Sequence, residues 1–509
     1  MNRLSLKSLL LLLPALLAAP TWAHPQQSAS VTDNEVKTPA AATRMAAPVI
    51  GQVFAFPVAT KSAEAQKLVE TAIDQYENHL LDDSVRTAQS ATAKDPQFAL
   101  AYAVWSYATR GGSPNPEAAR KAELLAANAP AEERKLVNFL TAVQKADRLP
   151  AISAMNDLLA GLPNDRHVLF LTSEWLYYQQ DYDRSVAMLE QVIKLDPSFA
   201  PAYNMLGYAK VETGTPDPAK AIAYLKRYAE LEPGQPNPED SLGEVSRYGW
   251  DDQGSLLHYS TALKLDPKYI YSQIGLGDTA AVMGDFSRAR TEYGKALAMA
   301  TSNGDRFHIE YQKALLNFRE GKFADGLQAL TDLEHQAHAA HEPYAEFEIL
   351  EAHALLLASP QEQLQKLREI EGTFSAPLAG MSEPDRNASL ASIWRDQVRG
   401  LALHNQLDAA KETVSKLETL AAKSRDLIVE NCYESARGYV LFAQKDFANA
   451  AGELSADPRS PLTLKWLAVA RQNAGDSKNA EAAKLRLKYL RAPTAEWFLA
   501  TRQASAAAN

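Results

Sequence analysis

Six prolines recur at almost constant spacing through the first half of the chain. The spacings are 34, 33, 34, 36 and 34 residues, and each proline follows a stretch whose apolar residues recur with helical periodicity: Pro96, Pro130, Pro163, Pro197, Pro233 and Pro267. Proline ends a helix because it lacks a backbone N–H and clashes with the preceding turn. The spacing therefore predicts a series of helix pairs, each of which needs a neighbouring copy to bury its apolar face.

Alignment on these prolines brings the other positions of each copy into register. In one copy Val186, Leu189 and Val192 form an apolar stripe on the second helix. Glycine recurs at one position of the first helix: Gly207, Gly243 and Gly277. Glycine costs roughly 1 kcal/mol in a helix relative to alanine, but it lets two helices cross closely. We therefore expect the two helices of a pair to touch at this position.

The repeat resembles the tetratricopeptide repeat, a 34-residue helix pair with a Leu-Gly pair on its first helix and alanines on its second. The matching residues are Leu206-Gly207, Leu242-Gly243, Leu276-Gly277, Ala118, Ala289 and Ala296. Phrases such as DPQFALAY and PNPEDSLGE are similar to those of long exported bacterial members of this family. The resemblance implies an all-α fold, a right-handed superhelical solenoid of about 11–12 antiparallel helix pairs.

The regularity of the repeat divides the chain into segments. We expect the N-terminal and central repeats of the solenoid at 58–371 and degenerate C-terminal repeats at 384–491. Between them, glycine, serine and proline interrupt the helical pattern, so we expect a hinge at 372–383. Residues 492–509 are expected to form a C-terminal tail.

The first residues are typical of an export signal. Arg3 and Lys7 supply positive charge, and residues 9–19 form an apolar core that is too short to span a bilayer. A small-x-small cleavage site follows. We therefore expect a signal peptide at 1–23 and a low-complexity, mostly disordered leader at 24–57. The mature protein is expected in the bacterial periplasm, with secretion as the alternative, and without an integral membrane segment.

The charge and the cysteine content narrow the classes of partner and chemistry. Without Arg3 and Lys7 the chain has 50 basic and 62 acidic side chains, a formal charge of −12. This charge disfavours nucleic acid and anionic lipid as partners. Cys432 has no second cysteine with which to form an internal disulfide, and it lies in a helical pattern. We interpret it as a small buried apolar residue.

A search for catalytic and cofactor motifs finds none in the sequence. There is no HExxH, no Gly-x-Ser-x-Gly, no phosphate-binding glycine loop and no EF-hand run, so we expect no cofactor. His335, His338 and His341 form a close group, but on a helix the third would be turned away from the first. We interpret this group as a polar segment between repeats. The alternative is that the three histidines bind a divalent metal ion weakly.

The side chains left over after helix packing define a candidate binding surface. In a solenoid of this kind, one set of first-helix positions faces a concave groove. The set is rich in tyrosine and acidic residues: Phe170, Glu174, Tyr177, Tyr178, Asn204, Tyr208, Glu212, Asp240, Glu244, Arg247, Tyr248, Tyr271, Asp278, Tyr311, Phe318 and Arg319. Tyrosine suits recognition because it combines a rigid apolar ring with a hydroxyl. We expect a neutral or basic protein segment in this groove, with a polysaccharide as the alternative occupant.

Two classes of function remain open. The first is a non-enzymatic protein–protein interaction scaffold of the bacterial cell envelope that binds a protein segment in the groove. The alternative is a carbohydrate-active or peptidoglycan-acting enzyme on a helical-hairpin scaffold, with Asp240, Glu244 or Glu174 as acid or base. A repeat of 34 residues opens into a superhelix and does not close a ring, and no segment is long enough for a separate catalytic domain. Both points favour the scaffold.

Overall fold

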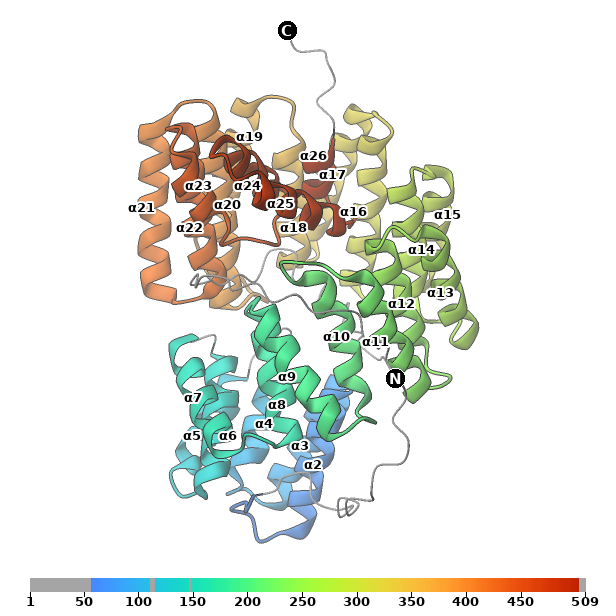
Figure 1. Ribbon diagram of the computed structural model, residues 1–509, viewed down its shortest axis with the longest axis vertical. Coiled ribbons are helices and arrows are strands. Elements are labelled where there is room, and N and C mark those ends of the chain that lie inside the picture. The colour runs from blue at the N-terminus through green and yellow to red at the C-terminus, as the bar shows by residue number, and fades with distance from the viewer. Residues whose placement is uncertain (1–55, 110–114, 146–147, 503–509) are drawn as a thin grey trace.

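The computed structural model describes residues 56–109, 115–145 and 148–502, and within these ranges it contains only helices, turns and loops (Figure 1). The expected signal peptide at 1–23 and nearly all of the expected leader at 24–57 lie outside the described residues. None of the helices in these ranges is both long enough and apolar enough to cross a membrane.

In the described part of the chain, the helices form twelve successive pairs, followed by one short helix. The first six pairs are α2 (Ala63–Glu77) with α3 (Leu81–Lys94), α4 (Ala99–Ala108) with α5 (Pro116–Ala126), α6 (Ala131–Gln144) with α7 (Arg148–Gly161), α8 (Arg166–Tyr178) with α9 (Tyr182–Leu195), α10 (Ala200–Glu212) with α11 (Pro218–Leu231), and α12 (Pro236–Tyr248) with α13 (Asp252–Leu265). The next four are α14 (Ile270–Met283) with α15 (Phe286–Met299), α16 (Asn303–Arg319) with α17 (Phe323–Ala339), α18 (Pro343–Leu356) with α19 (Pro360–Phe374), and α20 (Glu383–Leu403) with α21 (Leu407–Ser424). The last are α22 (Leu427–Ala443) with α23 (Phe447–Leu454), and α24 (Pro461–Asn473) with α25 (Ser477–Tyr489), before α26 (Ala495–Thr501). The predicted all-α fold of antiparallel helix pairs is confirmed.

The turn inside a pair is built the same way in several repeats. Gly284 ends α14 in the left-handed conformation at φ +85°, which glycine adopts without strain. The carboxylate of Asp285 then accepts a hydrogen bond from the backbone N–H of Arg288 and so caps α15. The second helices α9, α11, α13 and α25 are capped alike, by Asp181, Asp217, Asp251 and Asp476.

The recurrent glycines lie where the two helices of a pair touch. A Cβ atom on Gly207 would come within 2.5 Å of the Leu225 side chain. The equivalent contacts are 2.8 Å between Gly243 and Tyr259, and 2.5 Å between Gly277 and Tyr293. The prediction that glycine permits a close crossing at this position is confirmed.

Three segments of the C-terminal half were expected to be irregular, and the structure can be compared with each expectation. Residues 375–382 connect α19 to α20 where a hinge was expected at 372–383, and one apolar cluster joins Phe347, Phe374 and Leu390 across this connection. The expected tail at 492–509 contains α26, which packs on α18 and α24. His335 and His338 lie on α17 and not in a segment between repeats, because α17 continues to Ala339.

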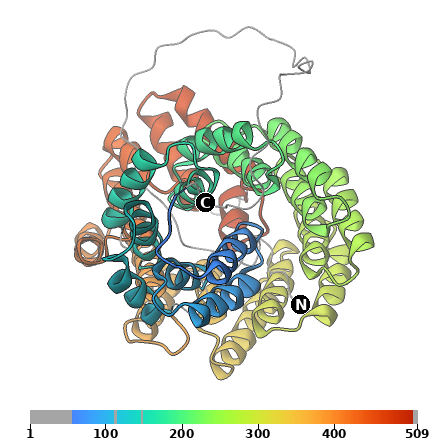
Figure 2. The ribbon, with the colours of Figure 1, turned by 90° about the horizontal axis from the view of Figure 1, so that it is seen from below.

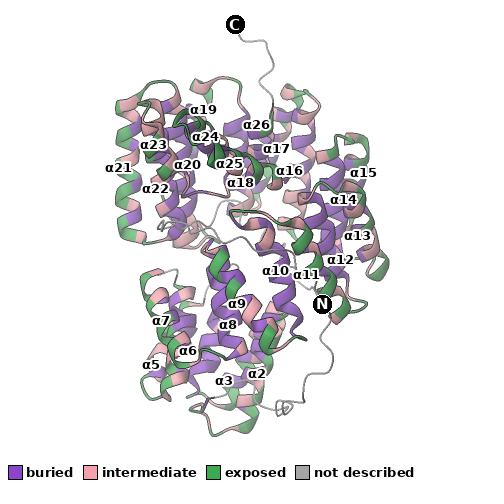
Figure 3. Cartoon of the chain, viewed as in Figure 1, coloured by how far each residue is buried: buried purple, intermediate pink, exposed green. Residues whose placement is uncertain are grey.

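The solenoid winds round until its later repeats lie above its early ones, with α20 to α23 over α5 to α7 (Figure 1). An ion pair joins the two levels, with 2.5 Å between Nη1 of Arg148 on α7 and Oε2 of Glu430 on α22. Seen along the axis, the helices form a ring, and a red helix from the C-terminal part of the described chain lies inside it (Figure 2). The first helices of the pairs are the more deeply buried ones (Figure 3), and in α8 every residue after Arg166 is buried.

Candidate functional site

The inward positions of the first helices do not form an open groove. Most of the side chains expected there are buried: Phe170, Glu174, Tyr177, Tyr178, Asn204, Tyr208, Asp240, Glu244, Arg247, Tyr271, Asp278, Tyr311 and Phe318. Glu212, Tyr248 and Arg319 are partly buried. The expectation of an exposed tyrosine-rich surface is therefore wrong. These side chains pack against neighbouring first helices and, in part, against residues from the C-terminal end of the described chain.

Glu174 shows how the inward acids are used. Its Oε2 accepts a hydrogen bond of 2.8 Å from the hydroxyl of Tyr76 and one of 3.3 Å from the hydroxyl of Tyr107. These tyrosines lie on α2 and α4, and Glu174 lies on α8. A buried carboxylate is stable only when such donors replace water. Glu174 therefore links three first helices of the N-terminal repeats.

Asp240 and Glu244 on α12 have the same structural role. Asp240 accepts a hydrogen bond of 2.7 Å from Ser272 on α14. Glu244 accepts hydrogen bonds from Tyr208 on α10, at 3.2 Å, and from Tyr248, at 2.9 Å. Burial, and then repulsion from the Glu244 carboxylate, raises the pKa of Tyr208 well above its ordinary value. The acids considered for glycoside hydrolysis are thus engaged in bonds between helices.

The inner face of the central repeats is covered by the end of the chain itself. We call residues 484–502 the C-terminal segment; it comprises the end of α25, a short connection and α26. The segment carries five basic side chains and one acidic side chain. It passes the C-terminal ends of α10, α12 and α14, where its arginines donate to backbone carbonyls that lack intrahelical partners, and it then reaches Arg319 at the end of α16.

Arg486 closes the end of α10. Its Nη1 donates to the carbonyl oxygens of Val211, at 3.4 Å, and Thr213, at 3.2 Å, and also to that of Glu212. Its Nη2 lies 2.6 Å from Oε2 of Glu212. A cation is favourable here because the carbonyl end of a helix carries partial negative charge. Burial would raise the pKa of Glu212, but the positive charges of Arg486 and Arg459 outweigh it and lower that pKa.

Arg491 repeats this arrangement at the end of α12. Its guanidinium makes a two-pronged ion pair with Asp252, with 3.1 Å from Nη2 to Oδ2, and donates to the carbonyl oxygen of Arg247 at 3.4 Å. The guanidinium also stacks 4.1 Å from the ring centroid of Trp250. The Trp250 indole N–H donates to the carbonyl oxygen of Lys488 at 3.1 Å. The segment is therefore held through both its side chains and its backbone.

Inner-face arginines hold the next part of the segment. Arg247 donates from Nη1 to the carbonyl oxygen of Arg491 at 3.4 Å. Arg319, at the end of α16, donates to the carbonyl oxygen of Thr494 at 3.4 Å and stacks on the rings of Trp497 and Phe498. The contacts thus continue from α10 to α16 along one line.

The expected groove residues divide into two groups around this segment. Glu212, Arg247, Tyr311 and Arg319 contact the C-terminal segment. Among the others, Glu174, Tyr208, Asp240 and Glu244 bond to helices of the solenoid, and Arg459 stacks on Tyr177. Sequence reasoning missed the other half of the contact: Arg486, Arg491, Trp250 and Asp252. The one available signal was the basic run KLRLKYLR, which we assigned wholly to a repeat.

Comparison with known proteins finds solved structures of low identity and low TM-score. No family model and no curated protein matches the sequence. Among solved structures, the APC/C Cut9–Hcn1 hetero-tetramer is 13% identical over 84% of this chain and 76% of that chain, with a TM-score of 0.36. A tetratricopeptide repeat protein from Parabacteroides merdae is 10% identical over 54% of this chain and 93% of that chain, with a TM-score of 0.35. The type IV pilus biogenesis factor PilW is 17% identical over 41% of this chain and 92% of that chain, with a TM-score of 0.33.

All three identities are below 25% and all three TM-scores are below 0.5, so these similarities carry no argument about the family or the function of this chain. The helix pairs also lack an obvious metal centre: across the described ranges, no three histidine, cysteine, aspartate or glutamate side chains converge to hold an ion. Within the expected histidine group, Nδ1 of His338 lies 2.9 Å from Oε1 of Glu346.

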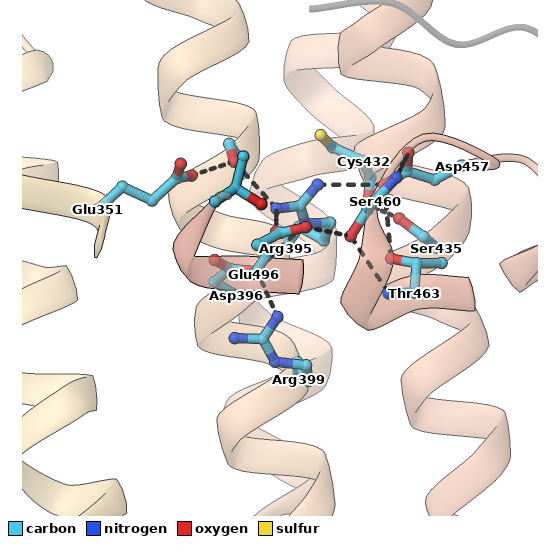
Figure 4. A network of polar contacts seen from close by, with 12 residues as sticks. Glu351, Arg395, Asp396, Arg399, Cys432, Ser435, Asp457, Ser460, Thr463 and Glu496 are labelled. Carbon is cyan, nitrogen blue, oxygen red and sulfur yellow. Dashed lines mark hydrogen bonds and ion pairs between the residues drawn. The ribbon is translucent and has the colours of Figure 1, made fainter. Parts of the chain in front are cut away.

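A buried polar network anchors the far end of the C-terminal segment (Figure 4). Arg395 on α20 is its centre, and its guanidinium reaches Asp396 at 3.2 Å, Asp457 at 3.1 Å and Glu496 at 3.2 Å. Glu496 lies on α26 and also accepts a hydrogen bond of 2.9 Å from the Ser460 hydroxyl. This network joins α20, the loop before α24, and α26.

Cys432 on α22 lies beside the network. It is buried in the apolar cluster of the C-terminal repeats, and burial raises the pKa of its thiol far above the ordinary value. The prediction of a small buried apolar residue is confirmed for Cys432.

Proposed function

We propose that this protein is a non-enzymatic interaction scaffold of the bacterial cell envelope, and that the inner face of α10 to α16 binds a basic segment of a partner protein. One observation carries the proposal: the same face holds the basic C-terminal segment through Arg486 and Arg491. A partner segment with the same chemistry competes with the C-terminal segment for this face.

The chemistry of the face supports a basic ligand. Successive first helices present their carbonyl ends along one line, and each end attracts positive charge. Glu212 and Asp252 add carboxylates at two of these ends, and Trp250 adds a ring on which a guanidinium stacks. Arginine suits these positions because its planar fork pairs with a carboxylate and its face stacks on an aromatic ring. The partner motif is therefore two arginines about five residues apart, as in Arg486 and Arg491.

The placement in the cell envelope rests on the export signal expected at 1–23. The enzymatic alternative has less support, because Glu174, Asp240 and Glu244 are each engaged in hydrogen bonds that join first helices. Repeat scaffolds of this kind bind through extended surfaces built from many helices. An exported scaffold with an occupied inner face fits regulated capture of another exported protein.

A peptide titration tests the proposal. The probe is a fluorescent synthetic peptide with the sequence of residues 484–502, followed by anisotropy as full-length protein is added. The double variant Arg486→Ala/Arg491→Ala weakens the internal segment, so we expect it to bind the peptide at least tenfold more tightly than the wild type does. The matched control, Lys478→Ala/Lys484→Ala, removes two exposed charges of α25 and should behave as the wild type.

Two further comparisons make the titration decisive. Circular dichroism must show that both double variants keep the helix content of the wild type. A second peptide with glutamate in place of both arginines should fail to bind the Arg486→Ala/Arg491→Ala protein. Equal binding of the two peptides, or no binding by any variant, contradicts the proposal.

A further inference from the structure

A cavity of about 180 Å³ lies where the C-terminal segment crosses α18, α20 and α22. Its wall includes Glu351 from α18, Arg395 from α20, Asn431 from α22 and Glu496 from α26. About 10–15 Å³ is enough to admit a water, so this volume has room for a molecule of several non-hydrogen atoms. It is distinct from the line of helix ends that holds Arg486 and Arg491.

Asn431 is a buried amide in the wall of this cavity that the described part of the fold leaves without a hydrogen-bond partner. It is 1% exposed, it lines the cavity, and neither Oδ1 nor Nδ2 has a hydrogen-bond partner among the described residues. Buried amides are nearly always paired, because removal from water is costly without a replacement bond. The amide of Asn431 therefore presents one acceptor and two donors to whatever enters the cavity.

The charges of the wall do not balance. Four carboxylates line the cavity, from Glu348, Glu351, Asp457 and Glu496, against the guanidinium groups of Arg395 and Arg459. Asp457 and Glu496 pair with Arg395. Glu351 instead accepts a hydrogen bond from the Ser392 hydroxyl (Figure 4). Oε1 of Glu348 lies 3.9 Å from Nδ1 of His308. Glu351 is thus the carboxylate with no cationic partner at ion-pair distance among the described residues, and a positively charged ligand beside it would supply one.

The direction of the pKa shift of Glu351 agrees with this imbalance. Burial, and then repulsion from Asp396, raises the pKa of Glu351 to about 8, although Arg395 lowers it and Glu496 raises it further. Burial raises the pKa of Glu496 as well. A cation beside Glu351 would offset this repulsion.

We propose that this cavity binds a small organic cation with a primary ammonium group, which Glu351 and the Oδ1 atom of Asn431 contact. Leu355, Ile428 and Leu490 supply apolar wall for its alkyl part. An ammonium group suits the site because it offers three donors and one positive charge. A metal ion suits it less well, because no three ligand side chains of the described residues converge on a point.

Isothermal titration calorimetry on the full-length protein at pH 8 tests the proposal. The probes are 1,4-diaminobutane and butylamine, with 1-butanol as the neutral analogue and butyrate as the anion. We expect saturable binding of at least one amine and no binding of 1-butanol or butyrate. Glu351→Gln and Asn431→Leu should each weaken amine binding at least tenfold. Glu190→Gln, which changes a carboxylate outside the cavity, should leave it unchanged.

Each outcome decides the question. Absence of amine binding to the wild type overturns the proposal. Binding of 1-butanol as tight as that of butylamine overturns it too, because the cavity would then select for apolar character alone. Asn431→Leu could fail to fold, and circular dichroism identifies that case. Glu351→Gln then decides, since a glutamine keeps the shape and the hydrogen bond to Ser392, and its unchanged affinity would contradict the role of Glu351.

Discussion

Arg486 and Glu212 are 274 residues apart in sequence, and Nη2 of Arg486 lies 2.6 Å from Oε2 of Glu212. The pair sits at the carbonyl end of α10, so one guanidinium satisfies a carboxylate and several orphan carbonyls together. This contact fastens the end of the chain to the inner face of its own solenoid. It also shows that the inner face at this helix end binds a positively charged guanidinium group.

The Arg486→Ala variant should lose stability because it removes the nearer of the two guanidinium groups that pair with the Glu212 carboxylate, and leaves only Arg459 at 4.0 Å. Breaking a fully buried ion pair costs about 3–5 kcal/mol, and this pair is partly buried, so we expect a loss toward or below the lower end of that range. The exposed pair of Lys484 with Glu481 contributes about 0–1 kcal/mol, so Lys484→Ala is the control. Urea unfolding followed by tryptophan fluorescence measures both effects. Similar losses in the two variants would contradict the role of Arg486.

The contribution of Glu212 also depends on pH. Its folded-state pKa is lowered from 4.5, so the stabilisation is present above pH 4.5 and is lost as the pH falls through the folded-state pKa. The difference between wild type and Arg486→Ala should therefore be largest at neutral pH and shrink in acid. A constant difference from neutral to strongly acidic pH would show that Glu212 is not the partner that matters.

Tyr208 should behave as a core residue and not as an exposed ligand contact. It is 3% exposed, and its hydroxyl donates to Glu244. Truncation of a buried aromatic residue to alanine costs about 3–5 kcal/mol. Tyr208→Phe keeps the ring and loses the hydroxyl contacts, each worth about 0.5–1.5 kcal/mol. Thermal and urea unfolding of the two variants measure the difference. If Tyr208→Ala were as stable as the wild type, the assignment of Tyr208 as a core residue would be contradicted.

Gly207 tests the close crossing of α10 and α11. An alanine Cβ at this position would lie 2.5 Å from the side chain of Leu225. Overpacking of this kind costs about 1–3 kcal/mol, against a gain in helix propensity of about 1 kcal/mol. We expect Gly207→Ala to be destabilising in the wild-type background and stabilising in Leu225→Ala. Additive effects in this double-mutant cycle would mean that the two residues do not touch.

Glu351 should make the protein less stable as the pH rises. Its pKa is about 8 in the folded protein against 4.5 ordinarily, so between these values the folded state holds a proton that the unfolded state has released. Stability falls with pH wherever the unfolded state binds fewer protons. Glu351→Gln should therefore gain stability relative to wild type from pH 5 to pH 8, with the exposed Glu117→Gln as control. Parallel curves of unfolding midpoint against pH would contradict this assignment.

The helix pairs could be predicted from the sequence because each depends on neighbouring residues. The proline spacing marks the helix ends, and Gly207 marks a contact between helices of one pair. The burial of Cys432 could also be predicted, because the residues next to it in sequence follow a helical apolar pattern. Such features follow from periodicity and propensity alone.

The state of the inner face could not be predicted in this way. Whether Tyr177 or Tyr208 is exposed depends on how closely successive first helices approach, which the pattern within one repeat does not specify. The docking of Arg486 depends on the winding of the whole solenoid, which brings residue 486 back to residue 212. In the sequence, the basic run KLRLKYLR resembles the exposed face of one more helix.

Hydrogen–deuterium exchange of the full-length protein tests the docking of the C-terminal segment most directly. The seven residues of α26 are too few to form a stable isolated helix, so protection there reports docking. The account predicts slow exchange in residues 490–502 of the wild type and faster exchange in Arg486→Ala/Arg491→Ala, with faster exchange also at residues 209–213 and unchanged exchange in α4. Equally fast exchange of residues 490–502 in both proteins would contradict the account.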